Sequence, residues 1–327
     1  ADKHLSVPTD KGANAGRKIG SLVAGMVAGA DSIADMAILR HGAMKSVFDH
    51  PYAPSSLGSF LREFAFGHVR QLDAVASRFL CGLTEIAPIV AGGGGRVMID
   101  IDDSIIEVHG HGKQGSGYGC SGVSGLNSLI TTLTTDHTAP VIVGQRLRKG
   151  SCGSSRGAAR MITDTLTTVG RIRAAAAVSV TPSVNGTEPQ PMPKPLVRAD
   201  SAFFGYPTIG AAVRGGADVS ITTGLNSVIK HSALAHMPSS HFCANAAWLV
   251  CAVMAFNLTR AAATLTGDPA LVKATTGTIR NKMISVPARI AYSARKLTLH
   301  LPTGWPWEKP WMTLFESMFR RNIPITA

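Results

Sequence analysis

The hydrophobic pattern of this chain changes at a run of four glycines, Gly92 to Gly95. Before the run, apolar residues recur every three or four positions over residues 19–39 and 59–80, which predicts helices. After it, short β-branched stretches that are typical of strands alternate with longer helical patterns. We therefore expect a helical N-terminal region over residues 1–94, joined by the glycine linker to an α/β core.

The order of the elements after the glycines constrains the fold further. Strand-like patterns cover residues 97–101 and 105–109, then 126–133 and 140–147; a helix over 156–177, a strand over 196–199, a helix over 207–214, a strand over 219–222 and a long helix over 244–264 follow. A group of strands followed by helix, strand, helix, strand and a long helix is the order of a ribonuclease-H-like α/β core with a mixed sheet. We assign this core to residues 95–264, and a basic tail with C-terminal helices to residues 265–327.

The composition is that of a folded, basic protein without a disulfide framework. Hydrophobic residues make up 45% of the 327 residues, enough for a buried core. Lysine and arginine exceed aspartate and glutamate by 32 − 20 = 12, which suits a polyanion partner but also a generically basic protein. Five scattered cysteines argue against a zinc site and favour the reducing cytoplasm. The longest apolar stretch, Ala246–Leu258, is too short for a membrane span and predicts a buried helix, so we expect no membrane partner.

Asp102 and Asp200 are the candidate catalytic and metal-binding residues. Each ends a short apolar strand pattern, and in the expected topology these two strands pair side by side. Paired carboxylates are hard oxygen ligands suited to Mg²⁺, which in a two-metal site activates a water or 3′-hydroxyl for phosphoryl transfer. The competing interpretation, that an aspartate at a strand end caps a turn, is the commoner case. On an ideal strand Asp100 shares a face with Asp102, whereas Asp103, the nearest rival, points to the other face.

Several long segments carry a family resemblance. They are Ile99–Gly110 (IDIDDSIIEVHG), Tyr118–Asn127 (YGCSGVSGLN), Arg146–Ser151 (RLRKGS), Arg198–Gly205 (RADSAFFG), Ala244–Leu249 (ANAAWL) and, in the tail, Val286–Arg295 and Leu301–Trp307. Together they resemble DDE-type insertion-sequence transposases, and in particular the thirteen-eighty insertion-sequence family.

This resemblance implies an enzyme that cuts and joins double-stranded DNA, at insertion-sequence terminal repeats and in target DNA. It implies two Mg²⁺ or Mn²⁺ ions held by two aspartates and a glutamate, a homodimer on DNA, and a cytoplasmic, nucleoid-associated location. The family's first aspartate stands two residues before a Ser or Thr and maps onto Asp102; the second precedes Ser-Ala-Phe and maps onto Asp200. The region 1–94 would serve DNA binding or assembly.

The chain departs from the family at the third carboxylate. In the family a glutamate lies near the start of the last core helix, but residues 219–244 of this chain contain no Asp or Glu. We infer an internal deletion with its junction near Lys230 and His231, and expect at most one weakly bound Mg²⁺ and little strand transfer. The alternative function is a catalytically inactive DNA-binding relic or regulator of transposition. A third interpretation, an unrelated small-molecule α/β enzyme, requires an apolar pocket near Asp102 and Asp200.

Basic residues predict where DNA would lie. Arg146, Arg148 and Lys149 follow a predicted strand and are candidates for phosphate contacts, although a solvated strand end explains them as well. Residues 273–327 contain nine Lys and Arg against two acids, a balance of +7, and form the best candidate for a backbone-binding surface. Within this tail the predicted DNA-binding residues are Arg289, Arg295 and Lys296.

Overall fold

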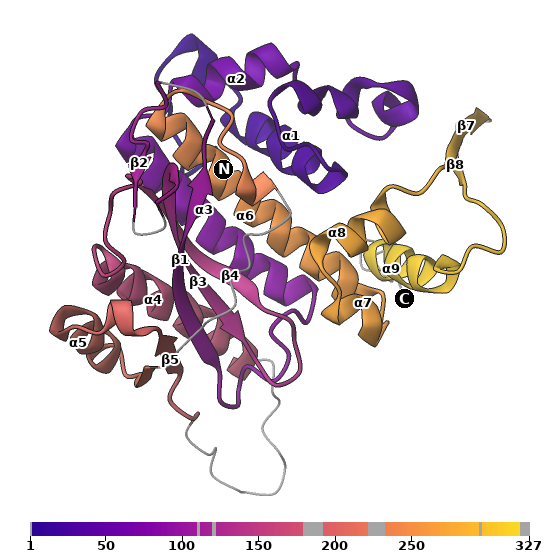
Figure 1. The fold of residues 1–327 in the computed structure, drawn as a ribbon. Coiled ribbons are helices and arrows are strands. Elements are labelled where there is room, and N and C mark those ends of the chain that lie inside the picture. Colours follow the sequence, from indigo (N-terminus) through magenta and orange to yellow (C-terminus); the bar gives the residue numbers. More distant parts are fainter. Residues whose placement is uncertain are drawn as a thin grey trace, which may run out of the picture.

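The structure is a computed structural model that describes residues 2–109, 112–119, 122–178, 192–221, 233–293 and 296–320. A mixed β-sheet with helices on both faces forms its centre (Figure 1). A helical N-terminal region lies at one end of this body, and a smaller C-terminal group of helices with a hairpin lies to one side. The protein is therefore a mixed α/β structure, as the sequence predicts.

Six strands form the central sheet. They are β1 (Met98–Glu107), β2 (Gly117–Tyr118), β3 (Ser124–Thr134), β4 (Val141–Arg148), β5 (Leu196–Ala199) and β6 (Asp218–Ile221). β3 lies antiparallel between β1 on one side and both β2 and β4 on the other, whereas β5 runs parallel to β1 and β6 parallel to β5. β1 and β5 are thus neighbours in the middle of the sheet, although about a hundred residues separate them in sequence.

Two pairs of helices cover the sheet. Ile99, Ile101 and Leu129 share a core with α4 (Ala158–Val178) and α5 (Tyr206–Arg214) on one face. On the other face, side chains such as Ile130 and Leu147 share a core with α3 (Phe66–Ile86) and α6 (Phe242–Leu265). The alternation of side chains along each strand separates these two cores.

Helix α6 is the central element of the fold. Of the described helices it alone is long and apolar enough to cross a membrane, yet it is mostly buried inside the protein, so it is a core helix, as its sequence predicts. The Trp248 indole Nε1–H donates to the carbonyl oxygen of Ala233 (3.0 Å), and the Asn257 amide accepts from the Ile142 N–H (2.9 Å) and donates to the Ile142 carbonyl (2.7 Å). These buried bonds join α6 to the segment before it and to β4.

The N-terminal region packs on α6 and shares its core. It contains short 3₁₀ turns at Asp10–Gly12, Ala34–Arg40 and Gly42–Ser46, and the helices α1 (Ala15–Ala28) and α2 (Pro54–Arg62). Gly29 ends α1 in the left-handed conformation (φ 115°), which glycine adopts without strain. The sequence predicts one helix over 59–80, but the chain forms two, α2 and α3, because it breaks over residues 63–65.

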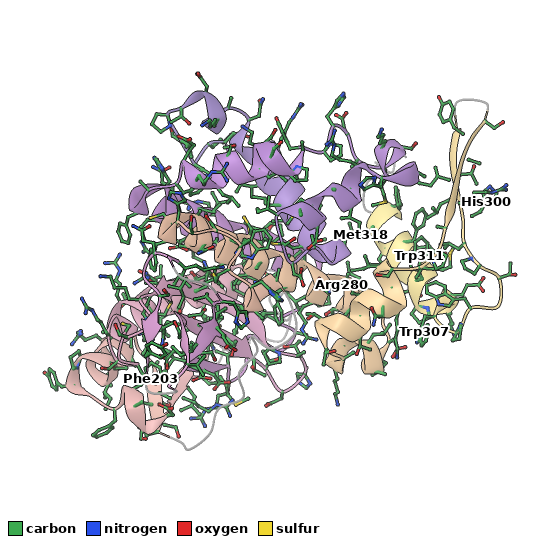
Figure 2. The ribbon with its side chains drawn as sticks, turned by 45° about the horizontal axis from the view of Figure 1, so that its top comes forward. Phe203, Arg280, His300, Trp307, Trp311 and Met318 are labelled. Carbon is green, nitrogen blue, oxygen red and sulfur yellow. The ribbon has the colours of Figure 1, made fainter. Side chains whose placement is uncertain are left out.

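The C-terminal part forms its own small cluster beside the end of α6. It contains α7 (Pro269–Lys273), α8 (Thr276–Ile279), a π-helical turn (Arg280–Ile284), a hairpin of β7 (Arg289–Ser293) and β8 (Lys296–His300), and α9 (Glu308–Arg320). Trp307 and Trp311 lie against this group of helices (Figure 2), where they pack with Leu271 and Met283. The sequence pattern predicts helices here but not the hairpin.

Candidate functional site

The structure brings Asp102 and Asp200 together at the centre of the sheet. The parallel register of β1 and β5 pairs Asp100 with Arg198 and Ile101 with Ala199. Asp200 follows the last residue of β5 with an extended backbone, so it continues this register beside Asp102, and the two charges interact. Asp102 lies in the middle of β1 rather than at a strand end, because β1 continues to Glu107 along its partner β3.

Negative charge concentrates around Asp102. Burial raises the pKa of its carboxyl to about 6, and the charges of Asp103, Asp200 and Asp100 add to the rise. A hydrogen bond from the Asp103 N–H to Asp102 Oδ1 (2.8 Å) acts in the opposite direction but does not cancel it. A half-buried carboxylate with like charges nearby favours a bound cation, whose charge would relieve the repulsion.

Asp100 and Asp103 are each neutralised by an arginine. Arg198 donates to Asp100 through Nε (2.6 Å) and Nη2 (2.8 Å), a bidentate pair on the same face as Asp102. On the opposite face Asp103 Oδ2 accepts from Arg148 Nη2 (2.6 Å) and from the Asn127 amide (2.6 Å). Of the four aspartates near this point of the sheet, Asp102 and Asp200 are the two without an arginine ion pair among the described side chains.

Asp200 also caps a turn. Its Oδ1 accepts a hydrogen bond from the Ala202 N–H (2.9 Å) at the start of a 3₁₀ turn, Ser201–Phe203. The side chain is half-buried, and its other oxygen takes no part in this cap. The capping role and a ligand role use different oxygens, so the geometry is compatible with both.

The described part of the chain supplies no third ligand. No group of three or more His, Cys, Asp or Glu side chains within it is placed to hold a metal ion, and α6 contains no Asp or Glu from Phe242 to Leu265. The expected deletion point, Lys230–His231, lies outside the described residues. As a donor set, two adjacent carboxylates fit one hard divalent cation but are too few for two.

The predicted DNA-binding residues have different surroundings. Lys149 and Arg289 are exposed, whereas Arg146 is half-buried beside Asp164. The backbone of Lys296 begins β8, and Arg295 lies outside the described residues.

Arg148 is the exception among these basic residues. The sequence predicts a phosphate contact for it, but its side chain is only 6% exposed. It donates to Asp103, to Asn127 Oδ1 (2.8 and 2.6 Å) and to the carbonyl oxygens of residues 153, 154 and 156. The guanidinium therefore makes structural hydrogen bonds inside the protein, a role that spacing in the sequence does not reveal.

Sequence reasoning misses a second group of arginines. Arg70 on α3 and Arg160 and Arg171 on α4 lie near Arg146, at the edge of the sheet that β4 forms. Arg70 and Arg146 are 76 positions apart, and no motif joins them; only the packing of α3 and α4 across β4 brings them together.

Comparison with known proteins finds one match. Residues 227–322 match the family model described as transposase DDE domain group 1, which supports a DDE transposase. No curated protein and no solved structure matches the chain. The matched segment covers α6 and the C-terminal cluster, and lies after both Asp102 and Asp200.

Proposed function

We propose that this chain is a DNA transposase of the DDE type with an incomplete carboxylate site. The observation that carries the proposal is that Asp102 and Asp200 lie one residue beyond the parallel register of β1 with β5, close enough for their charges to interact, in a chain whose following segment matches a transposase DDE domain. The sheet order, with β3 alone antiparallel between β1 and β4 and with β5 parallel beside β1, supports a ribonuclease-H-like core. The resemblance of the motifs supports the thirteen-eighty insertion-sequence family and an internally deleted copy.

Asp102 and Asp200 would hold one Mg²⁺ or Mn²⁺ ion in this proposal. The ion would supply Lewis-acid chemistry for phosphoryl transfer on double-stranded DNA, at insertion-sequence ends and in target DNA. The protein's own contribution is the fixed pair of carboxylates, with Arg198 holding Asp100 away from the ion. Since the nearby Asp100 and Asp103 are each paired with an arginine and the described residues offer no other carboxylate there, a second ion lacks ligands and the reaction is impaired.

Metal binding tests the site directly. Titration with Mn²⁺, followed by electron paramagnetic resonance, is expected to show one weakly bound ion in the wild-type protein. Asp102→Asn and Asp200→Asn should each abolish it, whereas the matched control Asp136→Asn, an exposed aspartate in the turn between β3 and β4, should leave it unchanged. Two tightly bound ions, or one that survives both site substitutions, would contradict the proposed site.

A cleavage assay tests the impairment. Terminal-repeat DNA from the element that encodes the chain is incubated with Mg²⁺ or Mn²⁺, and we expect DNA binding with little or no cleavage or strand transfer. Robust turnover that Asp200→Ala abolishes would refute the impairment and leave the transposase assignment intact.

The second candidate function is a DNA-binding regulator of transposition that has lost catalysis. The observation that favours it is the absence of any acidic residue on α6, the helix that would carry the third ligand. DNA binding with no cleavage under any metal condition, combined with inhibition of an intact relative in a transposition assay, would identify this function. The homodimer that the resemblance implies, and the cytoplasmic location, belong to both candidates.

A further inference from the structure

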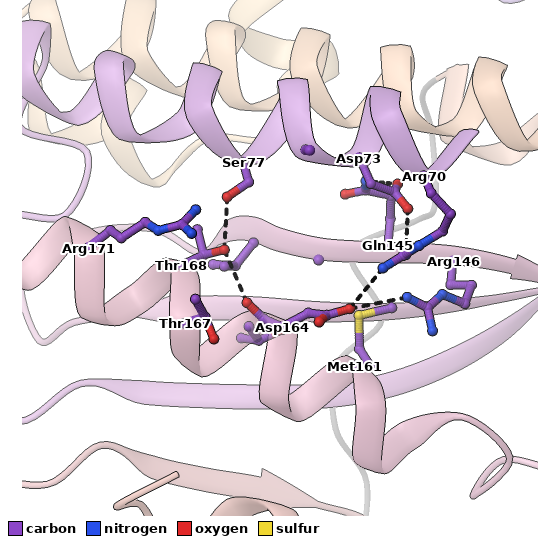
Figure 3. A pocket seen from close by; sticks show the side chains of 14 residues that line it. Arg70, Asp73, Ser77, Gln145, Arg146, Met161, Asp164, Thr167, Thr168 and Arg171 are labelled. Atoms are coloured by element: carbon purple, nitrogen blue, oxygen red, sulfur yellow. Dashed lines mark hydrogen bonds and ion pairs between the residues drawn. The ribbon is translucent and has the colours of Figure 1, made fainter. Parts of the chain in front are cut away.

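A polar hollow lies at the β4 edge of the sheet, between α3 and α4 (Figure 3). Its volume is about 200 Å³, several times the ~30 Å³ that one water molecule occupies in the liquid. α3 supplies Arg70, Asp73 and Ser77, and β4 and α4 supply the remaining walls. Two strands separate β4 from β5, so this hollow is distinct from the Asp102 and Asp200 site.

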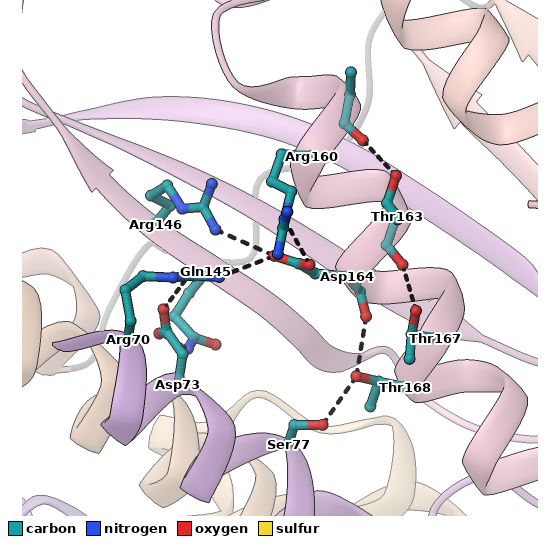
Figure 4. A network of polar contacts seen from close by, with 11 residues as sticks. Arg70, Asp73, Ser77, Gln145, Arg146, Arg160, Thr163, Asp164, Thr167 and Thr168 are labelled. Carbon is teal, nitrogen blue, oxygen red and sulfur yellow. Dashed lines mark hydrogen bonds and ion pairs between the residues drawn. The ribbon is translucent and has the colours of Figure 1, made fainter. Parts of the chain in front are cut away.

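One carboxylate in the hollow faces three guanidinium groups (Figure 4). Asp164 Oδ2 accepts from Arg70 Nη2 (3.1 Å) and lies 3.4 Å from Arg146 Nη2, while Asp164 Oδ1 accepts from Arg160 Nε (3.0 Å). Each arginine carries a full positive charge, and one carboxylate neutralises only one of them.

The neighbouring side chains leave this excess in place. Arg70 Nη1 donates to Asp73 Oδ2 (2.7 Å), whose other oxygen accepts from the Gln145 amide (2.9 Å). Arg171, which is exposed, lines the same hollow and adds a fourth guanidinium. Four arginines against two aspartates give a local balance of 4 − 2 = +2.

The positive excess costs free energy in the protein alone. Burial lowers the pKa of the Arg146 guanidinium, and the like charge of Arg70 lowers it further. Burial also raises the pKa of Asp73 to about 6, against the pull of Arg70. An anion in the hollow would pair with the guanidinium groups and raise the pKa of Arg146 back toward its ordinary value, although it would not lower the pKa of Asp73.

The donors around the hollow match a phosphate group. Planar guanidinium groups bind phosphate oxygens through two parallel N–H donors. The Ser77 hydroxyl of α3 and the Thr168 hydroxyl of α4 lie 2.9 Å apart, and Thr167 of α4 also lines the hollow (Figure 3). Hydroxyls of this kind are common partners of phosphate oxygens in DNA complexes.

The spacing of the arginines favours a polymer over a free ion. Arg160 and Arg171 are eleven positions apart on α4, or about 16 Å at 1.5 Å per residue. One phosphate ion cannot reach both ends of this span, whereas a DNA strand presents a phosphate every ~3.4 Å of helix axis.

We propose that the hollow between α3, β4 and α4 binds a phosphate group of the DNA backbone, with Arg146 and Arg70 at its base and Arg160 and Arg171 along its rim. The inference rests on the proposed function, because it takes DNA as the partner, and it adds a place where DNA is held away from the carboxylates. Contacts of this kind position the DNA and do not read its sequence.

Fluorescence anisotropy with a labelled DNA duplex, measured over a range of salt concentrations, tests the proposal. Arg146→Gln and Arg171→Gln are each expected to weaken binding about tenfold, the loss of one charge-assisted hydrogen bond, and to reduce the slope of log K against log salt by about one. The matched control is Arg78→Gln, which removes an exposed arginine of α3 that does not line the hollow, and it should change the affinity less than about twofold.

A second variant and a second ligand complete the test. Asp164→Asn removes a negative charge from the hollow and should tighten DNA binding, an effect opposite in sign to that of the arginine variants. If Arg146→Gln fails to fold, Arg171→Gln still tests the hollow, because Arg171 is exposed. If the wild-type protein binds DNA and none of the substitutions in the hollow changes the affinity or the salt slope, the inference is refuted and the proposed function still stands. Inorganic phosphate that binds in an Arg146-dependent way without any effect on DNA affinity would overturn it in favour of a small anion. A wild-type protein that binds Mn²⁺ but no DNA would overturn both proposals at once.

Discussion

Asp102 and Asp103 are adjacent in sequence, yet removing their charges should affect stability in different ways. Asp103→Asn leaves the buried guanidinium of Arg148 without a charged partner. Breaking a buried ion pair from one side costs about 3–5 kcal/mol. Because Arg148 keeps the Asn127 amide oxygen and three backbone carbonyls as acceptors, we expect the lower end of that range, about 3 kcal/mol.

Asp102→Asn has no such partner to disturb. It removes one of three carboxylates that share a face of the sheet, with Asp100 and Asp200 as the others. The Asn side chain retains an oxygen that accepts the Asp103 N–H. In metal-free buffer we therefore expect a change within about 1 kcal/mol, and a gain rather than a loss in free energy of unfolding.

Urea unfolding at pH 7 in the presence of EDTA, followed by far-ultraviolet circular dichroism, measures both variants against the wild-type protein. Two-state transitions with equal m values allow the midpoints to be compared directly. Equal destabilisation by the two substitutions would refute the division between a structural aspartate and a site aspartate. A stable Asp103→Asn protein that no longer binds Mn²⁺ would show that Asp103 is the ligand.

Two further predictions concern the scaffold. The pKa of Asp73 is raised to about 6 from 3.8, so the stability that its protonation contributes is fully present below pH 4 and is lost as the pH rises through 6. Asp73→Asn should remove about 2–3 kcal/mol of this pH dependence, measured as the difference in unfolding free energy between pH 4 and pH 7.5. Parallel pH profiles for the two proteins would contradict this prediction. Asn257→Ala leaves the buried N–H and C=O of Ile142 without their partner and should cost about 2–4 kcal/mol in urea unfolding; a loss below 1 kcal/mol would show that β4 finds other partners.

Most strands and helices of the core follow from the sequence pattern, because their apolar spacing matches their burial. The predicted strand over 196–199 coincides with β5, and the predicted helix over 244–264 differs from α6 by two residues at its start and one at its end. β1 differs more. The run of Asp102, Asp103 and Ser104 suggests a turn, but these residues stay in the strand because Arg148 and Asn127 satisfy Asp103 from across the sheet. A partner so distant in sequence leaves no local signal.

The candidate site was accessible to sequence reasoning only in part. The family resemblance selected Asp102 and Asp200, and the register of β1 and β5 then placed them side by side. The role of Arg148 was not accessible, since a basic residue at a strand end has the same pattern whether it points into the core or into solvent. Nor was the hollow at β4, because its residues come from three elements whose packing no periodicity encodes.

The parallel pairing of β1 with β5 also determines when the carboxylate pair exists. The ion pair of Asp100 with Arg198, next to the site, closes a loop of 98 residues. Contacts of such long range carry a large loop-closure entropy and form slowly during folding. The paired aspartates are therefore assembled only after β3, β4 and α4 have been synthesised and β5 has docked. Refolding followed through metal binding should lag behind refolding followed through helix content.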